Sequence, residues 1–105
     1  MKVLFDQGTP VPLRRHLRPH SVDTCAERGW STLRNGELLT QAETAAYEVF
    51  LTTDRNLKYQ QNLSGRIIRM LVLTTTSWPR ISRKVDLIRA ALAALDEGGY
   101  SEVEI

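Results

Sequence analysis

Short apolar runs alternate with amphipathic segments along the whole chain. Val3-Leu4-Phe5 is a continuous apolar run that ends at a polar turn, which is typical of a short buried strand. The stretch from Ile67 to Leu73 is the best candidate for a central strand. Between such runs, apolar residues recur at the three- and four-residue spacing of helices. The pattern therefore predicts strands and helices in regular alternation.

Start and stop signals place the predicted helices. Pro12 can open the first helix, Asn35 is a good N-cap for the second, and Gly65 follows the third. The Gly98-Gly99 pair ends the fourth and longest helix. The predicted strands cover residues 3–5, 20–24, 49–51, 67–73 and 100–105, and the predicted helices cover residues 12–17, 35–47, 56–63 and 80–95.

Strands that alternate with helices in this way form a mostly parallel sheet with helices on both faces. We therefore predict an α/β fold with a sheet of about five strands. The chain has 105 residues, which is a common size for one domain. It contains no internal repeat, low-complexity tract or linker, so residues 1–105 are expected to form a single domain.

Composition narrows the class of protein. The only cysteine, Cys25, cannot form an internal disulfide, and it is expected to be a small core or loop residue. The opening MKVLFDQ places Asp6 directly after three apolar residues, so it fails as a signal peptide. The longest apolar run is broken by Arg69 and is far shorter than the ~20 residues of a membrane-spanning helix. We expect a soluble, cytoplasmic protein that does not bind membranes.

Charge is distributed unevenly although the net charge is only +2. Four of the 12 acidic residues lie in the last ten positions, so residues 1–95 hold all 14 basic residues and 8 acidic ones, a surplus of +6. Most of the bases are arginines, which make two-pronged contacts with phosphate. Arg14, Arg15 and Arg18 form a basic helical turn with His16. This turn is interpreted as a plain surface, or alternatively as a contact for RNA or a partner protein.

Acidic residues follow two of the predicted strands directly. Asp6 comes after the first strand and Asp54 after the third. Because ligands bind at the carboxyl ends of the strands in open parallel sheets, both acids are expected at the same edge. Glu37 lies in the first turn of the helix that leads into the third strand, and the start of that helix can approach this edge. We therefore predict that three carboxylates from distant segments share one small volume.

Three carboxylates in one volume repel each other unless a cation is present. Mg²⁺ or Mn²⁺ is the natural partner, since these hard cations take a few carboxylates and also bind substrate phosphates. Such a metal stabilises charge on a phosphodiester under attack by water, so the predicted chemistry is that of a phosphodiesterase or nuclease. Each acid also has a structural alternative: Asp6 and Asp54 can cap turns or helices, and Glu37 is favoured by the helix dipole.

Three sequence elements resemble the PIN-like domains. They are VLFDQ at the N-terminus, NGELL at the head of a helix, and VFLTTDRNL at the end of a strand. They look most like a small, toxin-like bacterial branch of that family. Its members have an Asp after strand one, an Asp or Glu at a helix head, and a T-x-D-x-D/N element after the next strand. The resemblance covers roughly residues 1–75 and implies a three-layer PIN-like sandwich.

The resemblance also implies roles for individual residues. Asp6, Glu37 and Asp54 match the acidic metal site, and Asn56 stands where many relatives have a further Asp. Asn56 can coordinate through its carbonyl oxygen, but it adds no negative charge. PIN domains are associated with ribonuclease activity that depends on Mg²⁺ or Mn²⁺, and in bacteria often with an antitoxin protein. We accordingly expect a metal-dependent endoribonuclease that acts on RNA as the toxin of a toxin–antitoxin pair, with Asn56 orienting a water.

Four further residues are candidates for substrate binding. Lys58 and Tyr59 lie in an amide-rich segment beside Asp54 and can contact the RNA backbone or stack on a base. A solvated helix face is the alternative for that segment. Trp78 and Arg80 follow the fourth predicted strand at the same edge as the acids, and burial under the last helix is the alternative for Trp78.

Three other functions stay open. An inactive PIN-like module that binds RNA or protein without cutting is favoured by the Asn56 departure. A structural subunit would form a homodimer through the sheet edge near residues 102–105. A receiver-like domain also has an Asp after strands one and three and a Thr after strand four, which Asp6, Asp54 and Thr74 match. However, it expects two acids after strand one and a Lys after strand five, and neither is present.

Overall fold

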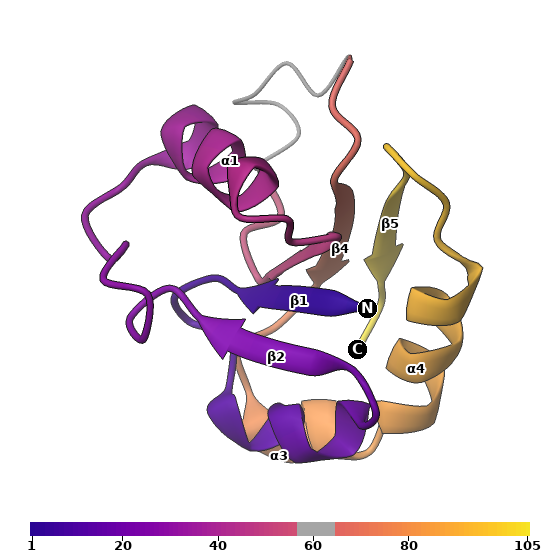
Figure 1. Ribbon diagram of the computed structural model, residues 1–105. Helices are drawn as coiled ribbons and strands as arrows, with labels where there is room; N and C mark the ends of the chain where they lie inside the picture. Colours follow the sequence, from indigo (N-terminus) through magenta and orange to yellow (C-terminus); the bar gives the residue numbers. More distant parts are fainter. Residues whose placement is uncertain (57–64) are drawn as a thin grey trace.

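Five parallel strands form one sheet at the centre of the protein, as a computed structural model shows (Figure 1). The structure describes residues 1–56 and 65–105. The order across the sheet is β2-β1-β3-β4-β5, and every neighbouring pair is parallel. The strands are β1 (Lys2–Phe5), β2 (Ser21–Thr24), β3 (Val49–Thr52), β4 (Arg69–Leu73) and β5 (Tyr100–Val103).

Helices cover both faces of this sheet, so the predicted α/β class is confirmed. Figure 1 shows α1 on one side, with η1, α3 and α4 on the other. The predicted helix at residues 56–63 falls largely outside the described residues. The described helices are the 3₁₀ helix η1 (Val11–Leu17) and the α-helices α1 (Asn35–Thr44), α3 (Trp78–Ser82) and α4 (Val85–Ala94).

The period of two along the strands divides the apolar residues between two cores. In β1, Val3 and Phe5 face the side covered by η1, α3 and α4, whereas Leu4 faces α1. In β3, Leu51 faces the side covered by η1, α3 and α4, whereas Phe50 faces α1. All four residues of this strand are buried. Central strands that are apolar on both faces are typical of parallel sheets. This explains why the apolar runs show no polar alternation.

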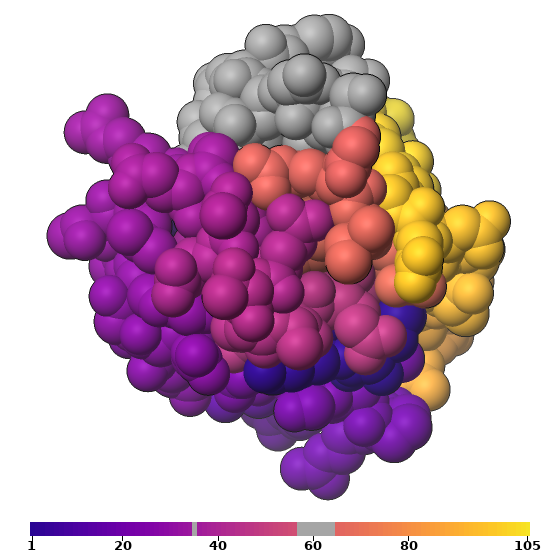
Figure 2. Space-filling model, turned by 45° about the horizontal axis from the view of Figure 1, so that its top comes forward, coloured from indigo at the N-terminus to yellow at the C-terminus, as the bar shows by residue number. Residues whose placement is uncertain are grey.

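An ion pair joins α1 to the segment that leads into β4. The Arg66 Nη1 atom lies 2.6 Å from Glu43 Oε1, and Glu43 Oε2 accepts hydrogen bonds from the backbone N–H groups of Ile67 and Ile68. Arg66 also donates to the carbonyl of Gly36. Figure 2 shows these two segments side by side on the surface, α1 in magenta and the residues before β4 in salmon.

Two predicted helix boundaries are wrong. The N-cap of α1 is Arg34 rather than Asn35, and the Arg34 side chain makes no capping hydrogen bond. The helix ends at Thr44 rather than near Tyr47, because Ala46 adopts a φ of +66°. A residue in the left-handed region commonly ends an α-helix.

The last predicted helix is also two helices instead of one. A turn at Arg83 and Lys84 separates α3 from α4. The Ser82 hydroxyl donates to the carbonyl of Pro79 at 2.8 Å, and the N–H of Arg83 turns to the carbonyl of Arg80. Hydroxyl groups that bond locally to the backbone compete with helical hydrogen bonds, so a Ser at this point favours the break. None of the described helices has the length and apolar character needed to cross a membrane.

Helix α4 offers a matched test of the core on its side of the sheet. Leu92 is fully buried, whereas Leu87 in the same helix is 48% exposed. We expect Leu92→Ala to lower the free energy of unfolding by about 2–5 kcal/mol, because it removes buried methyl groups and leaves a cavity. Leu87→Ala should change it by no more than about 0.5 kcal/mol. Urea unfolding followed by circular dichroism measures both, and equal losses would contradict the described packing.

Candidate functional site

Asp6 and Asp54 line one cleft at the carboxyl ends of the strands. The cleft has a volume of about 630 Å³ and is also lined by the loop before α1, including Arg34, and by Leu38 of that helix. β1 and β3, which these acids follow, are neighbours in the middle of the sheet. The two acids are therefore brought together as the sequence predicts.

The pairing of β1 with β3 places Asp6. Its backbone N–H donates to the carbonyl of Leu51 at 2.9 Å, which extends the strand pairing by one residue. The Oδ2 atom of Asp6 accepts a hydrogen bond from the Thr52 hydroxyl at 2.8 Å, and its Oδ1 atom accepts one from the N–H of Gln7 at 2.9 Å. Both carboxylate oxygens are thus oriented by the protein.

Thr52 connects the two acids. Its hydroxyl donates to Asp6 and accepts a hydrogen bond of 3.0 Å from the N–H of Asp54. The Oδ1 atom of Asp54 in turn accepts from the N–H of Asn56 at 3.0 Å. The sequence analysis missed Thr52 as a site residue. The available signal was a polar residue two positions after Phe50, on a face of the strand that is otherwise buried and apolar.

The electrostatics of the cleft are dominated by Asp6. Burial raises the pKa of Asp6 above its ordinary value, the hydrogen bonds from Thr52 and Gln7 oppose this rise, and the negative charge of Asp54 adds to it. Because the pKa of Asp6 is higher in the folded protein than in the unfolded chain, its contribution to stability is present at acid pH. That contribution is lost as the pH rises through the folded pKa, so ionised Asp6 destabilises the fold at neutral pH.

Glu37 lies outside this cleft. It is exposed, and it lines an adjoining hollow with Gly36, Thr40 and Arg66. The two hollows share only Leu33 among their described lining residues. Helix geometry explains the separation, because consecutive residues point about 100° apart and Leu38 is the neighbour that faces the cleft. The expected convergence of three carboxylates is therefore not present, and a metal-binding role for Glu37 stays a prediction.

The other predicted site residues are placed as follows. Asn56 is exposed and contacts Asp54 through its backbone N–H. Trp78 packs against the core on the η1 side, with its ring 5.6 Å from that of His16, and Arg80 donates to the backbone carbonyl of Ile105. Neither is among the described residues that line the cleft, so their roles in substrate binding stay predictions. Lys58 and Tyr59 lie outside the described residues.

Cys25 is unsuited to nucleophilic chemistry. It is buried, and burial together with the charge of Asp6 raises the pKa of its thiol to about 12. The thiol is therefore protonated at neutral pH, whereas the thiolate is the reactive form. Cys25 belongs to the core on the α1 side, in agreement with the structural role expected for it.

The receiver-like alternative stays a prediction. Its strand order is the one observed here, and Asp54 follows β3 as it requires. However, the Thr74 hydroxyl accepts a hydrogen bond of 2.8 Å from the N–H of Ile105, so it has a structural partner. The residues after β5 are Glu104 and Ile105, in the region where a receiver expects its lysine.

Comparison of the chain with models of protein families, with curated proteins and with solved structures gave no match. In residues 1–56 and 65–105, no three His, Cys, Asp or Glu side chains lie close enough to hold a metal ion together. The charged residues that line the cleft are two carboxylates and an arginine, and the buried Thr52 hydroxyl bonds to one of those carboxylates.

The hydrogen-bonded arrangement can be tested through the pKa of Asp6. We expect Asp54→Asn to lower this pKa, because the substitution removes a neighbouring negative charge. Thr52→Val should raise it, because the substitution removes a hydrogen bond to the ionised form. A pH titration of the Asp6 side-chain carboxyl by ¹³C NMR measures both shifts. Two shifts in the same direction would contradict the described network.

Proposed function

We propose that the protein is a metal-dependent endoribonuclease of the PIN-like type. The observation that carries this proposal is the placement of Asp6 and Asp54 in one cleft, linked through the Thr52 hydroxyl. The cleft lies where β1 and β3 are neighbours, and the chain continues from them toward opposite edges of the sheet. Such a topological switch point is where open parallel sheets bind their ligands.

The donor set fits Mg²⁺ or Mn²⁺. Mg²⁺ is usually held by one or two protein carboxylates, keeps several waters and completes its shell with substrate phosphates, so a third carboxylate is not required. Burial is the main cause of the raised pKa of Asp6, and the charge of Asp54 adds to it, so a bound cation would favour the ionised form of this carboxyl. When bound there, a divalent cation would stabilise the negative charge that develops on a phosphodiester during attack by water.

Residues of the cleft and its surroundings are proposed to bind the cation, position its ligands and contact the substrate. Asp6 and Asp54 hold the cation, and Thr52 keeps the Asp6 carboxylate in position. Arg34 lies in the same cleft and can pair with a phosphate oxygen of the substrate. No side chain is proposed as a covalent nucleophile. Asn56 is the further candidate for orienting water, since its backbone already contacts Asp54.

The biological role that we propose is the toxin of a toxin–antitoxin pair. The support for it is the similarity of VLFDQ, NGELL and VFLTTDRNL to the toxin-like branch of PIN-like domains. An antitoxin protein and cellular RNA are accordingly the proposed partners, and the cytoplasm is the proposed compartment.

Removing the Asp6 carboxylate tests the catalytic proposal. We expect Asp6→Asn to reduce Mg²⁺- or Mn²⁺-dependent cleavage of single-stranded RNA by ~100-fold or more, because metal stabilisation of the transition state is worth several kcal/mol. Asp96→Asn is the matched control, since Asp96 is exposed and precedes β5. It therefore lies at the amino ends of the strands, whereas Asp6 lies at their carboxyl ends. Cleavage is measured on purified, folded protein. Equal activity of Asp6→Asn and the wild type would refute the assignment.

A non-catalytic PIN-like binding module is the second candidate. It is favoured by Asn56 in place of an acid and by the position of Glu37 outside the cleft. Calorimetric titration with Mn²⁺ separates the two functions. For the enzyme we expect saturable binding that Asp6→Asn and Asp54→Asn both abolish and that Asp96→Asn leaves intact. Absence of Mn²⁺ binding by the wild type would favour the inert module.

A further inference from the structure

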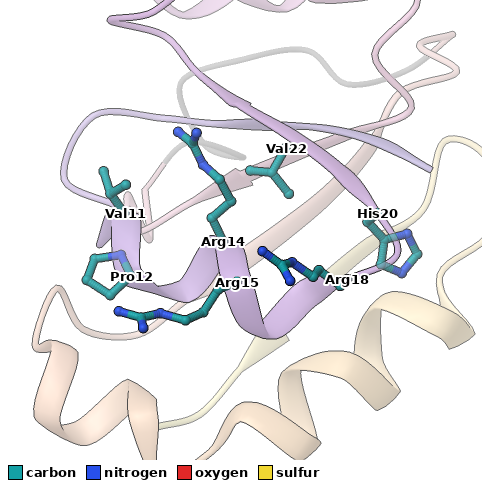
Figure 3. Close-up of a pocket in the computed structure, with 7 residues that line it drawn as sticks. All are labelled: Val11, Pro12, Arg14, Arg15, Arg18, His20 and Val22. Atoms are coloured by element: carbon teal, nitrogen blue, oxygen red, sulfur yellow. The ribbon is translucent and has the colours of Figure 1, made fainter.

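A second cleft, rich in arginine, lies beside η1 and the edge strand β2. It has a volume of about 580 Å³, and Figure 3 shows Arg14, Arg15 and Arg18 around it together with His20. None of its described lining residues is acidic. We refer to it as the basic cleft.

The three arginines are not equivalent. Arg14 is already paired, because its two terminal nitrogens donate to the two carboxylate oxygens of Glu27 at 3.2 and 2.7 Å. Arg15 and Arg18 are exposed, and neither forms an ion pair with an acid in the described parts of the chain. In Figure 3 the side chain of Arg18 extends back toward Arg15. Two guanidinium groups are thus available to an external anion.

The backbone under these two arginines is held in place. Arg89 of α4 donates to the carbonyl of His16 at 2.6 Å and to the carbonyl of Arg18 at 3.0 Å. This contact spans more than seventy positions of the chain. It fixes the end of η1 and brings a further positive charge to this side of the molecule. The backbone that carries Arg15 and Arg18 is therefore fixed by hydrogen bonds from α4.

The surroundings of His20 show the same excess of positive charge. Its Nδ1 atom lies 2.9 Å from the N-terminal amino group. Burial lowers the pKa of His20, and the positive charges of the N-terminus and Arg89 lower it further, while Glu48 opposes them. An anion bound in the basic cleft would compensate this charge.

A small hollow shares lining residues with both clefts. It is lined by Asp6 and Gln7, which also line the carboxylate cleft, and by Val11, which also lines the basic cleft. The basic cleft therefore begins at Val11, next to this hollow, and extends beside η1 toward His20 at the amino end of β2. Val11 is 53% exposed at the junction and offers an apolar contact to a sugar or base.

We propose that the basic cleft binds the phosphate backbone of single-stranded RNA whose cleavable bond lies in the carboxylate cleft, an inference that rests on the proposed function. Arg15 and Arg18 would pair with successive phosphates, since guanidinium groups bind phosphate oxygens in a two-pronged geometry. The hollow that shares residues with both clefts favours RNA over an acidic protein, because a polymer of phosphates can contact both sites in one binding mode.

Binding without cleavage tests this inference separately from catalysis. Fluorescence anisotropy is measured with labelled single-stranded RNA in EDTA, so that the RNA is not cut. We expect Arg15→Gln/Arg18→Gln to weaken binding about tenfold at low salt. The slope of log affinity against log salt concentration should fall by about 1.4, for two lost phosphate contacts. Arg83→Gln/Lys84→Gln is the control, because it removes the same charge from exposed positions between α3 and α4.

Further variants and competitors complete the test. Arg15→Lys/Arg18→Lys retains the charge but loses the two-pronged contacts, so we expect intermediate affinity and an unchanged salt slope. Thermal unfolding of each variant confirms that it is folded. Equal losses in the test and control pairs would overturn the inference. So would displacement by poly-glutamate as effective as by unlabelled RNA of equal charge, which would indicate an acidic protein partner.

The outcomes also separate the two proposals. If the wild type fails to cleave RNA but Arg15→Gln/Arg18→Gln still reduces the affinity and the salt slope, the basic cleft is supported and the nuclease assignment is wrong. If Asp6→Asn abolishes cleavage while the arginine pair leaves RNA binding unchanged, the nuclease assignment stands and the inference fails.

Discussion

The parallel pairing of β1 with β3 determines the geometry of everything described above. In this register Phe5 lies opposite Leu51, and the next N–H along the chain, that of Asp6, bonds to the Leu51 carbonyl. Asp6 therefore ends beside Thr52, which is 46 positions away in the sequence. A shift of the register by one residue would turn the apolar side chains of β1 to the wrong faces of the sheet, so the two cores keep the carboxylates where they are.

A half-buried carboxylate next to a second one is an unfavourable arrangement. The protein retains it with a hydroxyl that is itself fully buried and bonded on both sides, to Asp6 and to the N–H of Asp54. The ionised form of Asp6 opposes folding at neutral pH, because its pKa is higher in the folded protein than in the unfolded chain. Ionisable groups that lower the stability of the fold and face a cleft are typical of functional sites, and Asp6 is such a group.

The two clefts have opposite charge, and a small hollow shares lining residues with each of them. The carboxylate cleft needs a cation, whereas the basic cleft needs an anion, and a phosphate polymer with its divalent counterion supplies both. The near-neutral total charge hides this separation. All 14 basic residues precede the final strand, and two arginines that form no ion pair in the described parts of the chain line the basic cleft, beside a hollow that Asp6 also lines.

The sequence by itself determined the architecture. Doubly buried strands need continuous apolar runs and helices need three- to four-residue spacing, so the alternation of the two was sufficient to predict a parallel α/β sheet and to bring Asp6 and Asp54 to one edge. Local backbone conformations, such as the points where helices end, could be predicted less well from the sequence. The break between α3 and α4 depends on a side-chain hydrogen bond at Ser82, and the end of α1 depends on the conformation of Ala46.

Only the tertiary structure decided which side chains share a cleft. The direction of Glu37 depends on the rotation of α1 against the sheet, which is set by the packing of Leu38 and Leu39 and cannot be inferred from the position of an acid in a first turn. The link through Thr52 and the contact of Arg89 with the end of η1 likewise arise between segments far apart in the chain. Sequence periodicity assigns a residue to a face, but the rotation and packing of whole elements determine what that face meets.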